Sequence, residues 1–186
     1  MSDSQRKWKK ISGKIVYKNP WISIHEDKVS RPDGSEGIYG YLEKPVGVFI
    51  VAYNDKTKSV LFIKQHRYPI NKVIIEIPAG IAVGGDYLSE ARRELKEETG
   101  VSAKEWKHLG SFFVAPGHES TRIEVFLATG FDKQEMKTNG QEADEAIVEI
   151  IDIKVSDLKE KILAGEIECG ITLAALNLFL CQDSQN

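Results

Sequence analysis

The chain has 186 residues, of which 41% are hydrophobic and 28% are charged, and this composition is typical of a folded protein rather than a disordered one. A net charge of −3 provides no general basic field, so nucleic acid is not an expected partner. The apolar runs are far below the roughly 18 residues of a membrane span, and the polar start predicts no signal peptide, so we expect a cytoplasmic protein without a membrane partner.

Short strands are predicted for the first third of the chain. The apolar and polar side chains alternate in residues 14–19, 21–30 and 37–44, and turn-forming residues predict a hairpin between the last two. Two more strongly apolar strands follow at residues 46–53 and 59–66. The residues between these two strands predict a second hairpin.

One central helix is predicted at residues 87–99. It consists of good helix formers and stops at Gly100, and a strand at residues 73–80 precedes it through a loop that contains glycine. Strands are expected next at 108–115, 120–131 and 146–153, and closing helices at 155–166 and 170–182. This order predicts an α+β layer architecture rather than a series of βαβ units.

The acidic residues of the central helix are its most informative feature. Glu94 and Glu98 lie one turn apart on one face, Glu90 extends this row, and Glu97 lies beside it. Two interpretations are open. The row is either a solvated surface whose charge is offset by neighbouring basic residues, or a site for a divalent cation, because clustered carboxylates suit hard cations such as Mg²⁺.

Gly80 and the run from Arg93 to Val101 resemble the signature of the Nudix hydrolases, in which a glycine precedes Arg-Glu-aliphatic-x-Glu-Glu-x-Gly-aliphatic. The spacing between Gly80 and Arg93 is one residue shorter than in that signature, and Asp86 stands nearest to its first glutamate. The resemblance implies a Nudix α/β/α sandwich at residues 43–186. It also implies an N-terminal antiparallel β extension at residues 1–42.

Other segments resemble the ADP-ribose pyrophosphatase branch of that family, namely residues 65–68, residues 76–80, Pro116 and residues 164–180. This branch implies hydrolysis of the diphosphate bond of a nucleoside diphosphate sugar, with ADP-ribose as the first choice and AMP and ribose 5-phosphate as products. Mg²⁺ is the implied cofactor, with Mn²⁺ as a possible substitute. Exchange of the N-terminal region in relatives implies a homodimer. One alternative is the same reaction on another sugar nucleotide, such as GDP-mannose. The other is a non-catalytic domain that senses similar ligands, but such a sensor would not need three clustered carboxylates.

The resemblance also implies roles for individual residues. The implied metal ligands are the carbonyl of Ala79, Glu94 and Glu98. The implied catalytic residues are Arg93, Glu97 and an acid that activates water, for which Glu142, Asp144 and Glu145 stay open. The implied substrate contacts are Arg67, Glu76, Pro116 and Glu119.

Overall fold

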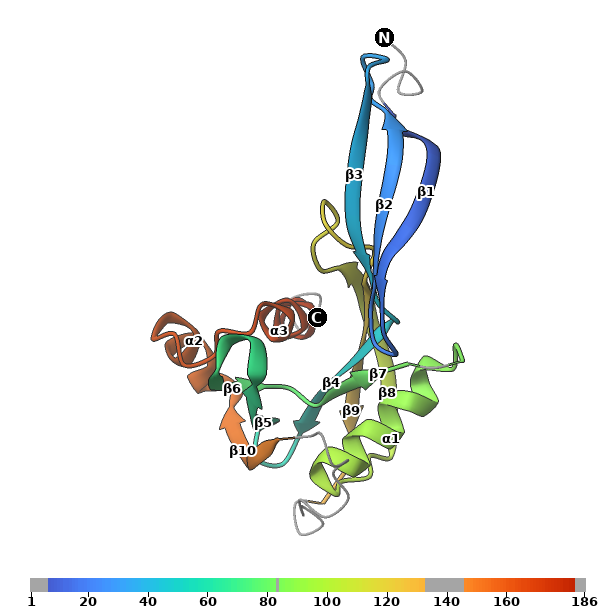
Figure 1. The fold of residues 1–186 in the computed structure, drawn as a ribbon. Coiled ribbons are helices and arrows are strands. Elements are labelled where there is room, and N and C mark those ends of the chain that lie inside the picture. Colours follow the sequence, from blue (N-terminus) through green and yellow to red (C-terminus); the bar gives the residue numbers. More distant parts are fainter. Residues whose placement is uncertain (1–6, 83, 133–145, 183–186) are drawn as a thin grey trace. The chain divides into compact units, whose positions relative to one another are not determined.

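The computed structural model describes residues 7–82, 84–132 and 146–182 (Figure 1). The chain forms two compact units. The first unit combines residues 1–46 with 113–122, and the second combines residues 47–112 with 123–186.

The first unit is built on a three-stranded antiparallel sheet in the order β1 (Lys9–Lys18), β2 (Ser23–Ser30) and β3 (Glu36–Glu43). The predicted hairpin joins β2 to β3, and its turn contains Gly34 with a φ of 88°. Residues 113–122 attach to β3 through hydrogen bonds in both directions. The Leu42 N–H donates to the His118 carbonyl at 2.9 Å, and the Ser120 N–H donates to the Leu42 carbonyl at 3.2 Å.

The second unit contains a mixed sheet in the order β10-β5-β4-β9-β8, with β6 paired to β5 and β7 paired to β4. The strands are β4 (Gly47–Asn54), β5 (Ser59–Arg67), β6 (Lys72–Glu76), β7 (Ala79–Ile81), β8 (Glu105–Phe113), β9 (Arg122–Thr129) and β10 (Ile147–Lys154). Strand β4 runs parallel to β9 and antiparallel to β5. Its residues are almost all buried, as expected of a strand that is covered on both faces.

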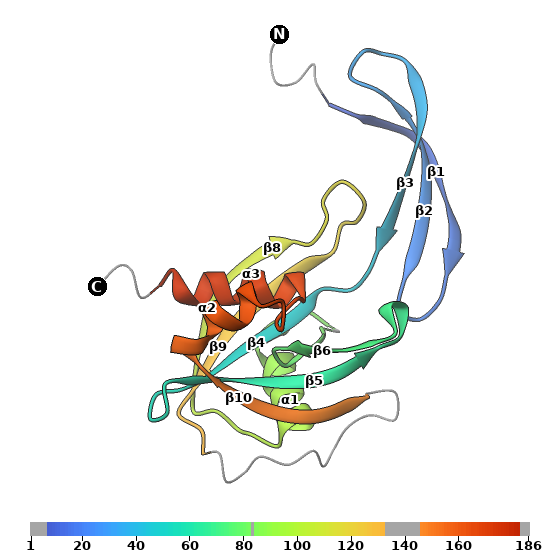
Figure 2. The same ribbon diagram turned by 90° about the vertical axis from the view of Figure 1, so that its left-hand side faces the viewer.

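Helices cover both faces of this sheet. They are α1 (Tyr87–Thr99), α2 (Val155–Leu163) and α3 (Gly170–Leu180). Figures 1 and 2 show α1 and α3 on opposite sides of β4. The predicted α/β/α sandwich with an N-terminal antiparallel sheet is therefore confirmed. Among the described residues, none of the helices has the length and apolar character needed to cross a membrane.

The bounds of α1 agree with the prediction because both ends are fixed locally. Asp86 precedes the helix, and its carboxylate accepts the Ser89 N–H at 3.1 Å as an N-cap. Gly100 ends the helix with a φ of 74° and donates its N–H to the Lys96 carbonyl at 2.8 Å.

The strand predicted at residues 73–80 is interrupted. Strand β6 ends at Glu76, and β7 begins at Ala79 on a different partner strand. Pro78 lies at the break, and because proline has no N–H it cannot donate a hydrogen bond to a neighbouring strand. The Pro78 carbonyl accepts the Ile50 N–H of β4 at 2.9 Å. The chain thus bends at Ile77–Pro78 immediately before the residues that face α1.

Candidate functional site

Two carboxylates of α1 lie buried against the Pro78–Gly80 bend. Glu98 is 2% exposed, and its Oε2 accepts the Ala79 N–H at 2.8 Å. Glu94 is 5% exposed and lies so close to Gly80 that a Cβ on this glycine would be 1.9 Å from the Glu94 carboxyl carbon. The interpretation as a solvated face is therefore wrong for these two glutamates.

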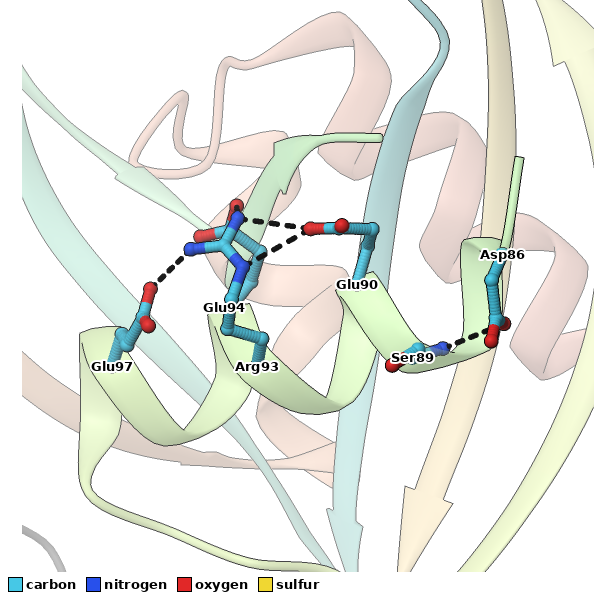
Figure 3. A network of polar contacts seen from close by, with 6 residues as sticks. All are labelled: Asp86, Ser89, Glu90, Arg93, Glu94 and Glu97. Carbon is cyan, nitrogen blue, oxygen red and sulfur yellow. Dashed lines mark hydrogen bonds and ion pairs between the residues drawn. The ribbon is translucent and has the colours of Figure 1, made fainter. Parts of the chain in front are cut away.

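Arg93 holds the acidic row together. Its guanidinium contacts Glu90 at 3.0 Å and also contacts Glu94 and Glu97, and Figure 3 shows it pointing toward all three. Burial lowers the pKa of Arg93, but the hydrogen bond with Glu90 and the negative charges of Glu94 and Glu97 outweigh burial and raise this pKa above its ordinary value. Arg93 stays charged and offsets the repulsion between the carboxylates.

The donors of this row suit a hard divalent cation. Carboxylate oxygens are the ligands that Mg²⁺ and Mn²⁺ prefer, and buried carboxylates require a cation or hydrogen bonds. Within residues 7–82, 84–132 and 146–182, no group of three or more His, Cys, Asp or Glu side chains is arranged to hold an ion. The oxygen donors of the row therefore fit a divalent cation in their chemistry. In this structure the guanidinium of Arg93 lies among the carboxylates and supplies the positive charge.

Arg67 and Glu76 form an ion pair at the ends of β5 and β6. Arg67 Nε donates to Glu76 Oε2 at 2.7 Å, and the two side chains are 42% and 6% exposed. Glu76 is the last residue of β6 and lies two residues before Pro78. The second unit therefore contains both the Arg67–Glu76 pair and the contact of Ala79 with Glu98, and the short segment from Glu76 to Ala79 connects the two.

The other two predicted substrate contacts belong to the first unit. Pro116 and Glu119 line a cavity of about 580 Å³, whose aromatic wall consists of Trp8, Tyr39, Tyr41 and Phe113. Glu119 binds the Lys44 ammonium at 2.7 Å and accepts the Thr121 hydroxyl at 2.5 Å. Burial raises the pKa of Glu119, but Lys44 and Thr121 outweigh it, so this carboxylate titrates below its ordinary range.

The remaining candidates, Glu142, Asp144 and Glu145, lie outside the described residues, and the identity of the water-activating acid stays a prediction. The sequence did not predict Lys44 as the partner of Glu119, and no motif marks this lysine. Sequence reasoning also gave no role to Thr172, although this residue lies in the C-terminal segment that resembles the ADP-ribose pyrophosphatase branch.

Comparison with known proteins identifies the family. Residues 43–167 match the model described as the NUDIX domain, and residues 8–42 match the model described as the nucleoside diphosphate sugar hydrolase N-terminal domain. The chain belongs to the Nudix family. The resemblance carried by Gly80 and residues 93–101 is confirmed, as is the prediction of a Nudix pyrophosphatase.

This Nudix hydrolase resembles several known proteins along most of its length. It is 30% identical over 170 residues to the ADP-ribose pyrophosphatase of Bacillus subtilis (strain 168), and the alignment covers 90% of each chain. It is 33% identical over 137 residues to the GDP-mannose pyrophosphatase of Shigella flexneri serotype 5b (strain 8401), covering 70% of this chain and 71% of that protein. A crystal structure of an ADP compounds hydrolase superposes with a TM-score of 0.81 and 18% identity over 98% of this chain and 96% of the other, which supports the fold.

Proposed function

We propose that this Nudix hydrolase cleaves the diphosphate bond of ADP-ribose and releases AMP and ribose 5-phosphate, with Mg²⁺ as cofactor and Mn²⁺ as a possible substitute. The observation that carries the proposal is the burial of Glu94 and Glu98 against the Pro78–Gly80 bend. Two buried carboxylates on one helical face suit a site that binds a cation together with phosphate groups. The substrate class is supported by the ADP-ribose pyrophosphatase of Bacillus subtilis, with which alignment covers 90% of each chain.

In the proposed reaction, the oxygen of a water molecule attacks one phosphorus atom, and the bond from that phosphorus to the bridging oxygen breaks. The bridging oxygen leaves with the electron pair on the other phosphate, and the water proton passes to a carboxylate, for which we propose Glu142 or Glu145. Glu94, Glu98 and the Ala79 carbonyl are the proposed metal ligands. A cation held by these ligands would supply positive charge to offset the negative charge of the diphosphate.

Arg93 and Glu97 have supporting roles in this proposal. Arg93 already contacts Glu94 and Glu97, so it can fix the orientation of both carboxylates before substrate binds. Glu97 is less buried than Glu94 and Glu98, so it is accessible to assist as a further ligand or as an acceptor of a hydrogen bond.

Four further residues are proposed to contact the substrate. A guanidinium forms directional hydrogen bonds to phosphate oxygens. Glu76 fixes Nε of Arg67, so the two terminal nitrogens of this guanidinium can donate to the substrate in one orientation. Pro116 and Glu119 line the cavity of the first unit, where Lys44 and Thr121 hold the Glu119 carboxylate in place.

We also propose that the protein is a homodimer with an N-terminal β extension at residues 1–42 and a Nudix domain at residues 43–186. The first unit exposes several large apolar side chains, namely Trp8, Ile11, Ile15, Tyr17 and Ile38. Exposed apolar surface is a common feature of interfaces. A cytoplasmic location, with no nucleic acid or membrane partner, is part of the same proposal. The net charge of −3 supports the part that concerns nucleic acid.

The alternative substrate is GDP-mannose, which is supported by the similarity to the Shigella flexneri protein. The test is the release of phosphomonoesters from ADP-ribose, GDP-mannose and NADH, with Mg²⁺ and with EDTA. We expect metal-dependent cleavage of ADP-ribose ahead of the others. Faster cleavage of GDP-mannose would keep the chemistry and correct the substrate. No cleavage, with ligands that still raise the melting temperature, would instead identify a sensor.

The variant Glu98→Gln tests the site within the same assay. Glutamine keeps an oxygen that can accept the Ala79 N–H, so the bend is preserved while the negative charge is lost. We expect turnover to fall by about a hundredfold or more. Glu160→Gln on the exposed face of α2 is the matched control and is expected to retain wild-type turnover. Wild-type turnover in Glu98→Gln would contradict the assignment of this carboxylate.

A further inference from the structure

The first turn of α3 contacts the end of β6 through a side chain. Thr172 is completely buried, and its Oγ1 accepts the Ile77 N–H at 3.3 Å, although the two residues are 95 positions apart in sequence. Strand β6 ends at Glu76, so a hydroxyl from α3 accepts this N–H at the point where the β6 ladder stops. Ile77 is also completely buried, which makes the loss of this acceptor costly.

Ile77 lies between the two halves of the proposed site. On its N-terminal side, Glu76 binds the guanidinium of Arg67 at 2.7 Å. On its C-terminal side, the Ala79 N–H donates to Glu98 at 2.8 Å. A shift of the Ile77 backbone would therefore move a proposed phosphate-binding pair and a proposed metal ligand at the same time.

Cys169 precedes α3. Burial raises the pKa of its thiol, Thr172 lowers this pKa through hydrogen bonds, and the Glu76 carboxylate raises it, with burial as the largest effect. The contact that joins the start of α3 to the residue after β6 is the hydrogen bond from the Ile77 N–H to Thr172 Oγ1.

We propose that Thr172 is a positioning residue of the active site, whose hydroxyl fixes the Ile77 backbone and thereby sets Glu76 with Arg67 on one side and Ala79 with Glu98 on the other. The inference rests on the proposed function for its catalytic readout. The placement of the Ile77 amide is measured independently of any substrate.

The test compares Thr172→Val with Thr172→Ser. Valine has nearly the same shape but removes the acceptor, while serine keeps the hydroxyl and loses only the methyl group. For Thr172→Val we expect kcat/KM for ADP-ribose to fall about tenfold or more, because small displacements of aligned groups are costly in rate. We also expect faster hydrogen exchange at the Ile77 and Ala79 amides, measured residue by residue by NMR. Thr172→Ser should restore most of both properties.

The control for a general loosening of α3 is Leu176→Val, a change at a residue of the same helix that is 1% exposed. This variant should lower the melting temperature while kcat/KM stays within about twofold of wild type. If Thr172→Val does not fold, Thr172→Ala compared with Thr172→Ser tests the same hydroxyl.

Three results would overturn the proposal. They are wild-type kcat/KM and exchange in Thr172→Val, failure of serine to restore what valine removes, and an equal loss of activity in Leu176→Val. If the wild-type protein cleaves none of the sugar nucleotides, the proposed function fails separately. In that case the exchange of the Ile77 and Ala79 amides still decides whether Thr172 sets this backbone.

Discussion

Gly80 offers the sharpest test of the position of Glu94. A Cβ built on Gly80 would lie 1.9 Å from both the carboxyl carbon and Oε1 of Glu94, and 2.4 Å from its Cγ. Ordinary contact begins near 3.4 Å, and the difference between 3.4 Å and 1.9 Å means that the carboxylate must move by about 1.5 Å. The backbone of Gly80 does not have a positive φ, so alanine acts through this contact rather than through backbone strain.

We therefore expect Gly80→Ala to fold and to lose activity. The atoms in conflict are at the flexible end of one side chain, so the cost in stability should be about 1–3 kcal/mol, the range for a disturbed buried polar group. For a chain of this size, each kcal/mol lowers the melting temperature by about 2–4 °C. A displacement of about 1 Å at a reacting centre can cost a hundredfold in rate, and we expect a loss of at least that size.

The assays are ADP-ribose hydrolysis with Mg²⁺ and the melting temperature with and without Mg²⁺. A cation that binds the folded state raises the melting temperature, so this increase should shrink in Gly80→Ala. Gly170→Ala is the matched control, because a Cβ at Gly170 meets no atom within 4 Å. A folded Gly80→Ala protein with turnover within about twofold of wild type would refute the reasoning about Glu94.

Two further predictions concern the Arg67 pair and the state of association. Glu76→Gln removes the charge that orients Arg67 and should raise KM for ADP-ribose about fivefold, with a smaller change in kcat. The control is Glu149→Gln, which alters the exposed pair with Lys64 and should leave KM and kcat unchanged. A wild-type KM in Glu76→Gln would contradict a role for the Arg67–Glu76 pair. Light scattering should give twice the monomer mass for the wild-type protein. Ile38→Lys should shift the protein toward monomer, because Ile38 is a large apolar side chain that is 66% exposed on β3. A monomeric wild-type protein would exclude the homodimer.

Sequence reasoning succeeded where structure is decided locally. The bounds of α1 followed from helix formers that end at Gly100, and the hairpin between β2 and β3 followed from its turn residues. The break between β6 and β7 was less predictable. The apolar run continues through Ile77, and only the change of partner strand shows that Pro78 divides it.

The site could be predicted only in part. Periodicity places Glu94 and Glu98 on one helical face, but it does not tell whether this face is directed at the sheet or at solvent. The resemblance to a known family favoured a metal site and did not specify the neighbours of the two carboxylates. The contacts of Glu119 with Lys44 and of Thr172 with Ile77 join residues far apart in the chain. Such contacts depend on how the elements pack, and no local pattern specifies them.

Asp86 has a consequence for the shortened loop before α1. Its carboxylate starts the helix by accepting the Ser89 N–H, and the helix then runs without interruption to Gly100. The positions of Glu90, Glu94 and Glu98 are therefore counted from the cap and not from Gly80. The loop length and the placement of the acidic row are two separate properties of this chain, and a residue can be lost between the bend and the cap while every carboxylate keeps its place on the helix.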